Sequence, residues 1–107
     1  MASGKDFLEF VLEQLSDLPD ITYRAMMGEF VIYYHGTVVA GIYDNRFLVK
    51  NTRAAQKLMP TATLEIPYPG GTPMLMVPDI ENRDLLAAVF NAVYDEVPVM
   101  KKKRKTK

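Results

Sequence analysis

The chain has 107 residues, of which 49% are hydrophobic and 24% charged, and this composition fits one soluble globular domain with a modest core. Cysteine is absent, which excludes disulfides, thiolate catalysis and thiolate metal sites and suits a reducing cytosol. Residues 1–14 carry acids and no continuous apolar run, so we expect neither a signal peptide nor a membrane helix, and a cytoplasmic protein.

The net charge of zero conceals two oppositely charged parts. Six of the 13 Lys and Arg residues occupy the last seven positions, which leaves seven bases against 13 acids, a formal charge of −6, in the remainder. Like charges repel and bury no apolar area, so we predict a folded domain over residues 1–98 and a disordered basic tail over residues 99–107. The candidate nucleic-acid contacts are the six cations Lys101, Lys102, Lys103, Arg104, Lys105 and Lys107.

The first half of the chain predicts a helix followed by a strand meander. Ser3 and Asp6 resemble a capping box, and apolar residues then recur at helical spacing until Pro19. Residues 21–50 are rich in apolar, β-branched and aromatic types, and turn residues interrupt them at 28, 35–36 and 44–45. Strict alternation would place Val38 with Ala40 and Ile42 on one face, and Val39 with Gly41 and Tyr43 on the other.

The second half predicts a short helix, two short strands and a longer helix. Asn51 or Thr52 caps the short helix, which Pro60 ends. Residues 64–66 and 74–77 have strand character, and the PYPGGT segment between them is a hairpin connection or surface loop. From about Glu81 to Val97 the apolar positions follow the helical period.

This order predicts an α+β fold with two layers, in which helices pack on one face of a mostly antiparallel sheet. The elements run helix, strand meander, helix, two strands, helix. We expect Ile32, Ala40, Ile42 and Val49 to lie buried under the last helix, because two layers are needed to cover the apolar faces.

An ordered set of short motifs resembles the N-terminal domain of the TfoX/Sxy family of competence regulators. The set comprises R-x-M-M-G from Arg24, the Y-Y-x-G turn, G-I-Y-D-N-R, the closing L-V-K and the later P-Y and P-M-L-x-V segments. The resemblance covers residues 7–98. It implies a small α+β domain without known catalytic residues, and some members are linked to transcriptional control of DNA uptake. One departure is Met27 in place of a common Phe. We also expect a stand-alone domain, without the second, C-terminal domain that full-length regulators carry.

Few residues are candidates for chemistry. His35 is the single histidine and adjoins a turn glycine, so we interpret it as a surface-turn residue rather than a metal ligand or base. Gly70 and Gly71 lack the Lys-Ser/Thr pair of a phosphate loop and predict a plain turn. The carboxylate pairs at residues 79 and 81 and at 95 and 96 are interpreted as solvated surface.

Methionines and tyrosines offer two further alternatives. Met26, Met27, Met74 and Met76 suit either core packing, which we favour, or an adaptable binding surface.

Tyr23, Tyr33, Tyr34 and Tyr43 would form a base-stacking platform only if they shared a face. Alternation sends Tyr33 and Tyr34 to opposite faces, and the body is acidic, so we favour tyrosines at the sheet rim or edge. Arg24 and Lys50 are interpreted as ion-pair partners of Glu29 or Glu65 rather than as ligand contacts.

These observations favour a non-enzymatic regulatory or interaction domain that acts through protein contacts, without a cofactor or a metal. One alternative is an electrostatic, non-specific nucleic-acid binder that uses the basic tail, and another is an enzyme of unknown type. A solubilising tail or contact with an acidic membrane surface also stays open. The apolar strands at residues 64–66 and 74–77 predict a homodimer.

Overall fold

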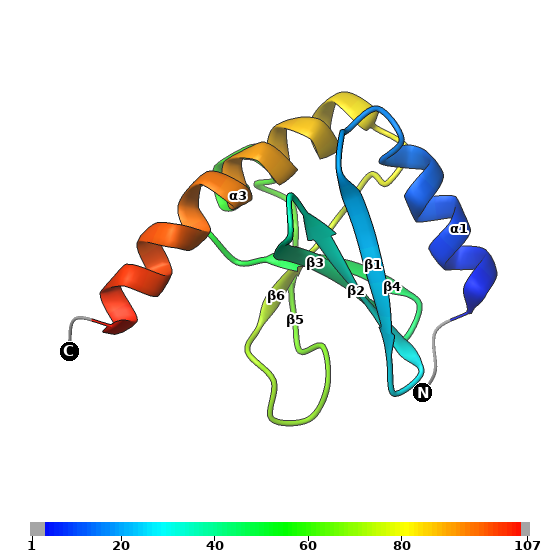
Figure 1. Ribbon diagram of the computed structural model, residues 1–107, viewed down its shortest axis with the longest axis horizontal. Helices are drawn as coiled ribbons and strands as arrows, with labels where there is room; N and C mark the ends of the chain where they lie inside the picture. The colour runs from blue at the N-terminus through cyan, green and yellow to red at the C-terminus, as the bar shows by residue number, and fades with distance from the viewer. Residues whose placement is uncertain (1–3, 106–107) are drawn as a thin grey trace.

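A computed structural model describes the backbone of residues 4–105 and the side chains of residues 4–97. Six of the nine elements form an antiparallel sheet in the order β1-β2-β3-β4-β6-β5, and the other three are helices. The predicted α+β class and the predicted order of elements along the chain are confirmed. The elements are α1 (Lys5–Gln14), β1 (Ile21–Met26), β2 (Glu29–Tyr34), β3 (Thr37–Tyr43), β4 (Arg46–Lys50), α2 (Arg53–Leu58), β5 (Leu64–Glu65), β6 (Met74–Met76) and α3 (Arg83–Lys105). Figure 1 shows that α3 crosses the sheet and that the β5–β6 loop extends away from it.

Three tight turns set the register of the meander. Each turn places two residues at positive φ, which matches the twist of the strands that it joins. The pairs are Met27–Gly28, His35–Gly36 and Asp44–Asn45. The predicted turns are therefore confirmed. The sequence did not predict that Met27, a bulky residue, adopts a positive φ of 53°.

A β-bulge changes the predicted faces at the start of β3. The pairing shifts between Ile32, which faces Ala40, and Tyr33, which faces Val38. Val39 is the extra residue, and it joins Ala40 in the core cluster. The prediction that Val38 shares the face of Ala40 is wrong, because one inserted residue reverses the alternation.

The helices cover one face of the sheet. Ile32, Ala40, Ile42 and Val49 are each 0% exposed, as predicted. They pack in one cluster with Leu8, Val11 and Leu15 from the α1 region and with Leu86, Val89, Phe90, Val93 and Val97 of α3. Burial of this apolar area is the main stabilising contribution to the fold.

Helix ends differ in part from the predicted ones. The N-cap of α1 is Gly4 rather than Ser3, and the helix ends at Gln14, where the Leu15 N–H bonds to both Val11 and Leu12 carbonyls. Thr52 caps α2, since its Oγ1 accepts a 3.1 Å hydrogen bond from the Ala55 N–H.

Helix α3 continues past Pro98, the predicted domain boundary, to Lys105. A proline inside a helix removes one hydrogen bond and can be accommodated by bending. The side chains of residues 98–107 lie outside the described residues, so disorder of the tail stays a prediction. None of the described helices is both long and apolar enough to cross a membrane.

Candidate binding face

The face of the sheet opposite the core carries its own buried residues. Val31 is 5% exposed and Leu48 is 0% exposed, yet neither belongs to the helix-packed core cluster. They pair with Gly41 across β2, β3 and β4 and so share a face with it. We call this surface, on which Tyr43 and Tyr68 lie, the tyrosine face.

The ring of Tyr43 lies over Gly41. A Cβ atom at Gly41 would be 2.5 Å from Cε2 of Tyr43, so any larger residue there collides with the ring. The G-I-Y sequence of residues 41–43 places this glycine two positions before the tyrosine, on the same side of the strand. The absence of a side chain at Gly41 therefore leaves the space that the Tyr43 ring occupies.

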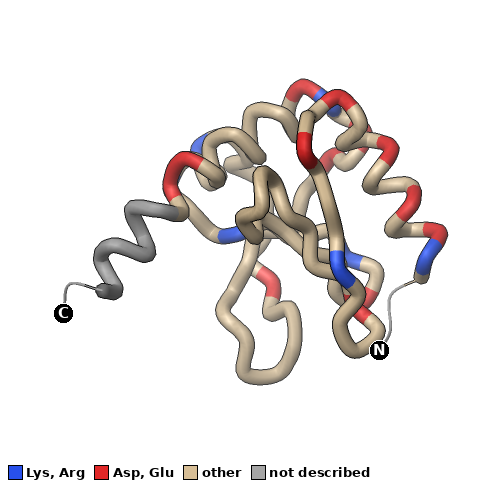
Figure 2. Tube along the Cα trace, viewed as in Figure 1, with Lys and Arg blue, Asp and Glu red and all other residues tan. Residues whose placement is uncertain are grey.

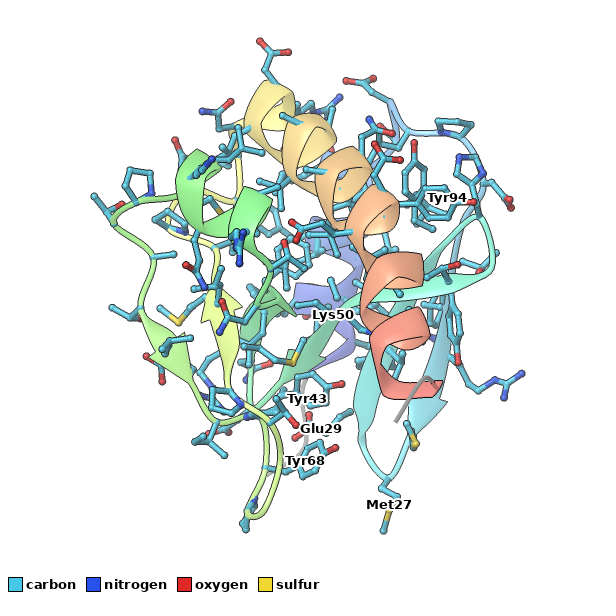
Figure 3. The ribbon with its side chains drawn as sticks, turned by 90° about the vertical axis from the view of Figure 1, so that its left-hand side faces the viewer. Met27, Glu29, Tyr43, Lys50, Tyr68 and Tyr94 are labelled. Atoms are coloured by element: carbon cyan, nitrogen blue, oxygen red, sulfur yellow. The ribbon has the colours of Figure 1, made fainter. Side chains whose placement is uncertain are left out.

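Tyr68 projects from the β5–β6 loop and meets Tyr43. The two ring centroids are 5.9 Å apart at an interplanar angle of 58°. Pro67 is buried, whereas Tyr68 is 56% exposed, and a Cβ at Gly71 would lie 3.0 Å from the Tyr68 ring. Figure 3 shows Tyr43, Glu29 and Tyr68 grouped below Lys50, while Met27 stands apart at its hairpin tip.

Arg46 ties this loop to the sheet. Its guanidinium donates to the Tyr43 carbonyl at 3.1 Å and to the Ile66 carbonyl at 3.0 Å, and it pairs with Glu65 at 3.2 Å. The planar fork of arginine suits several acceptors in fixed directions. Glu65 thus pairs with Arg46.

Two cavities lie on the tyrosine face, and Pro67 and Tyr68 line both of them. The first, which we call the tyrosine cavity, has a volume of about 300 Å³. The second, which we call the loop cavity, has about 350 Å³. The tyrosine cavity is lined by Val38, Tyr43, Lys50, Asn51, Pro67, Tyr68, Thr72 and Met74. The loop cavity is lined by Glu29, Asp44, Arg46, Ile66, Pro67, Tyr68 and Pro69.

The electrostatics of the two cavities differ. Lys50 is the one charged side chain among the described residues of the tyrosine cavity, whereas Glu29 and Asp44 stand in the loop cavity with Arg46. Burial raises the pKa of the Tyr43 hydroxyl, and nearby Tyr68, Glu29 and Tyr33 raise it further. Tyr43 is therefore a protonated hydrogen-bond donor at neutral pH.

Charges elsewhere are spread over the helices. Figure 2 shows acidic residues along α1 and around the start of α3, and none in the β5–β6 loop.

Glu96, predicted to be solvated, instead accepts a 2.8 Å hydrogen bond from the Ala54 N–H and so secures the start of α2. The other acids of the two candidate pairs, Asp79, Glu81 and Asp95, are exposed or at the surface, as predicted.

The candidates for chemistry do not meet in one site. His35 occupies its turn with Nδ1 3.3 Å from Oδ2 of Asp20, and its ring stacks near Tyr34 and Tyr94. Gly70 lies in a turn with φ 83°, as predicted. Within the part of the chain that the structure describes, no group of three His, Cys, Asp or Glu residues is placed to hold a metal ion.

The predictions for three of the methionines and for Tyr34 are wrong. Met26, Met27 and Met76 are 52%, 98% and 36% exposed rather than packed in the core, because the first two lie at the tip of the projecting β1–β2 hairpin. Tyr34 is 3% exposed and donates to Asn91 Oδ1 at 2.8 Å, so it belongs to the core rather than the rim. The six cations proposed for nucleic-acid contact lie outside the residues whose side chains are described.

Comparison with known proteins matches residues 13–95 to the TfoX N-terminal domain. A curated relative, the uncharacterized 12.7 kDa protein in the trpE 5′ region of Spirochaeta aurantia, is 29% identical over 80 residues. This alignment covers 75% of the present chain and 70% of the relative.

Proposed function

The chain belongs to the TfoX N-terminal domain family, and from this premise we propose that it is a non-enzymatic regulatory domain that binds a partner protein through its tyrosine face. The observation that carries the proposal is a solvent-exposed Tyr68 standing between two cavities on a preformed surface. The link of related regulators to transcriptional control of DNA uptake supports a regulatory role, and we place its action in the cytoplasm.

The surface around Tyr68 has the features of a protein contact. Tyr68, Ile66 and Met76 are 56%, 48% and 36% exposed, and none of them is charged. Aromatic residues next to pockets dominate the energetics of many interfaces.

A matched pair of variants tests the proposal. Tagged wild-type protein, Tyr68→Ala and Tyr23→Ala are used to capture partners from the native cell extract. Tyr23 is the control, because it is 46% exposed on the edge strand β1, away from the cavities. We expect Tyr68→Ala to lose a specific partner that the other two proteins retain. Equal recovery with both variants would contradict the role of the tyrosine face.

We also propose self-association at the β5 edge. Leu64 and Ile66 are 58% and 48% exposed beside a two-residue edge strand, and exposed apolar edges favour pairing with a second copy. Light scattering of the wild type at high micromolar concentration is expected to give a dimer mass, which Leu64→Asp reduces. A monomer mass for the wild type would exclude this contact.

A second candidate function rests on the separation of charge along the chain. The +6 tail attracts phosphates while the −6 remainder repels them, which favours weak, sequence-independent binding of nucleic acid by the tail alone. A chain without the tail should lose nucleic-acid binding and keep partner binding by the tyrosine face, so this change distinguishes the two functions.

A further inference from the structure

The tyrosine cavity combines two tyrosine rings, one lysine and several neutral polar side chains. We propose that it binds a small ring-bearing monoanion, namely an aromatic or heteroaromatic carboxylate. A ligand there would lie beside Tyr68 and so regulate the partner contact, a consequence that rests on the proposed function. The binding event itself does not depend on that function.

The size of the cavity favours a small molecule. Its volume of about 300 Å³ is at the lower end of the range for ligand pockets. This space suits one ring system rather than a run of peptide. Val38, Pro67 and Met74 give the cavity apolar walls.

The two tyrosines favour a flat, aromatic ligand. Tyr43 and Tyr68 present ring surfaces at the cavity, and offset or edge-to-face contacts between rings are favourable beyond the area that they bury. A Cβ atom at Gly41 or Gly71 would crowd these rings, so the two glycines leave the space that the rings occupy. The two rings therefore lie side by side at the cavity.

The charge distribution favours a single negative charge. Lys50 contributes the cation, and an ammonium group has three N–H donors, so it can bind a carboxylate while it keeps a contact within the protein. The Glu29 and Asp44 carboxylates in the adjoining loop cavity would repel an anion placed there. The ligand is thus expected to direct its carboxylate toward Lys50 and its ring toward Tyr68.

Neutral hydrogen-bond donors of the cavity can also bind the carboxylate of the ligand. Tyr43 keeps its proton at neutral pH because burial raises its pKa, and Tyr43 and Thr72, which each carry a hydroxyl group, both line the cavity. Asn51 also lines it, with its Oδ1 already accepting from Gln56 at 2.6 Å. These groups can donate to a carboxylate without adding a second positive charge.

The test is a titration of the ¹⁵N-labelled full chain with 2-naphthoate, followed by amide chemical shifts. We expect saturable shifts confined to residues 38–51 and 67–74. Lys50→Met should weaken binding about tenfold or more, since hydrogen bonds to charged groups are the stronger class. Lys57→Met, an exposed lysine on α2, is the matched control and should leave affinity unchanged.

Two further comparisons separate the contribution of the ligand's charge to affinity from that of its ring. The uncharged 2-naphthamide should bind at least tenfold more weakly than 2-naphthoate, and Tyr68→Ala should lose most of the affinity for both. Shifts that do not saturate, shifts confined to the basic C-terminal residues, or equal affinity for 2-naphthamide would overturn the proposal. If 2-naphthoate does not bind but Tyr68→Ala still loses its partner protein, this inference fails while the proposed function stands.

Discussion

The two faces of the sheet have different compositions although they share the same strands. On the helix-covered face, Ile32, Ala40 and Ile42 are fully buried against α1 and α3. On the tyrosine face, buried Leu48 lies among glycine, tyrosine and charged residues, and two cavities open to solvent. The first face stabilises the fold, whereas the second is the face that we propose contacts another molecule.

The largest expected effect falls on the helix-covered face. Ile42→Asp places a charge where the side chain is 0% exposed, and we expect a loss of at least about 4 kcal/mol in the free energy of unfolding. Thr37→Asp, next to a turn, should cost about 1 kcal/mol or less. Urea denaturation measures both, and equal midpoints would mean that the two positions do not differ in burial.

A smaller effect is expected on the tyrosine face. Gly41→Ala forces the Tyr43 ring to move, because the new methyl would lie 2.5 Å from Cε2, and should cost about 1–3 kcal/mol. In a Tyr43→Ala background the same substitution should cost at least about 1 kcal/mol less. Strictly additive costs in this double-mutant cycle would show that the ring does not lie over Gly41.

The difference between the two faces also explains which parts of the structure the sequence could predict. Apolar periodicity locates the core because burial needs only apolar residues on one side, and residues such as Ile42 and Val49 are found this way. Alternation also places Gly41 and Tyr43 on the opposite face. The position of Val38 on that face depends on a bulge at Val39, and the contact with Tyr43 depends on a loop that presents Tyr68, 25 positions later in the sequence. Neither leaves a periodic signal. The G-I-Y and P-Y-P-G-G segments were the available hints, since glycines beside tyrosines can seat their rings.

A smaller change in the free energy of unfolding is expected from the tyrosine face at alkaline pH. Burial raises the pKa of Tyr43 above its ordinary value of 10.0. Above that value the unfolded chain releases the proton while the folded chain keeps it, so the free energy of unfolding falls as pH rises through this window. Tyr43→Phe should remove part of that fall, measured by urea denaturation at about pH 8 and about pH 11. An unchanged pH dependence would contradict burial of the hydroxyl.

The smallest effect on stability is expected from the tail. A chain that ends at Met100 should unfold within about 0.5 kcal/mol of the full chain, because the removed residues include no apolar side chain. It should also lose the weak duplex-DNA affinity of about 10⁻⁴ to 10⁻⁶ M expected for the tail, measured by mobility shift across salt concentrations. Salt-resistant, sequence-dependent binding by the shortened chain would make the folded body the nucleic-acid reader.

The most direct test of a binding role for the tyrosine face is a photo-crosslinking scan of both sides of the molecule. A crosslinking residue replaces Tyr68 or Met76 on one side, and Glu9 of α1 or Ala88 of α3 on the other, all of which are exposed positions. In native extract we predict one partner that is captured from Tyr68 and Met76 and not from Glu9 or Ala88. Capture of the same partner mainly from the two helix positions would contradict the account.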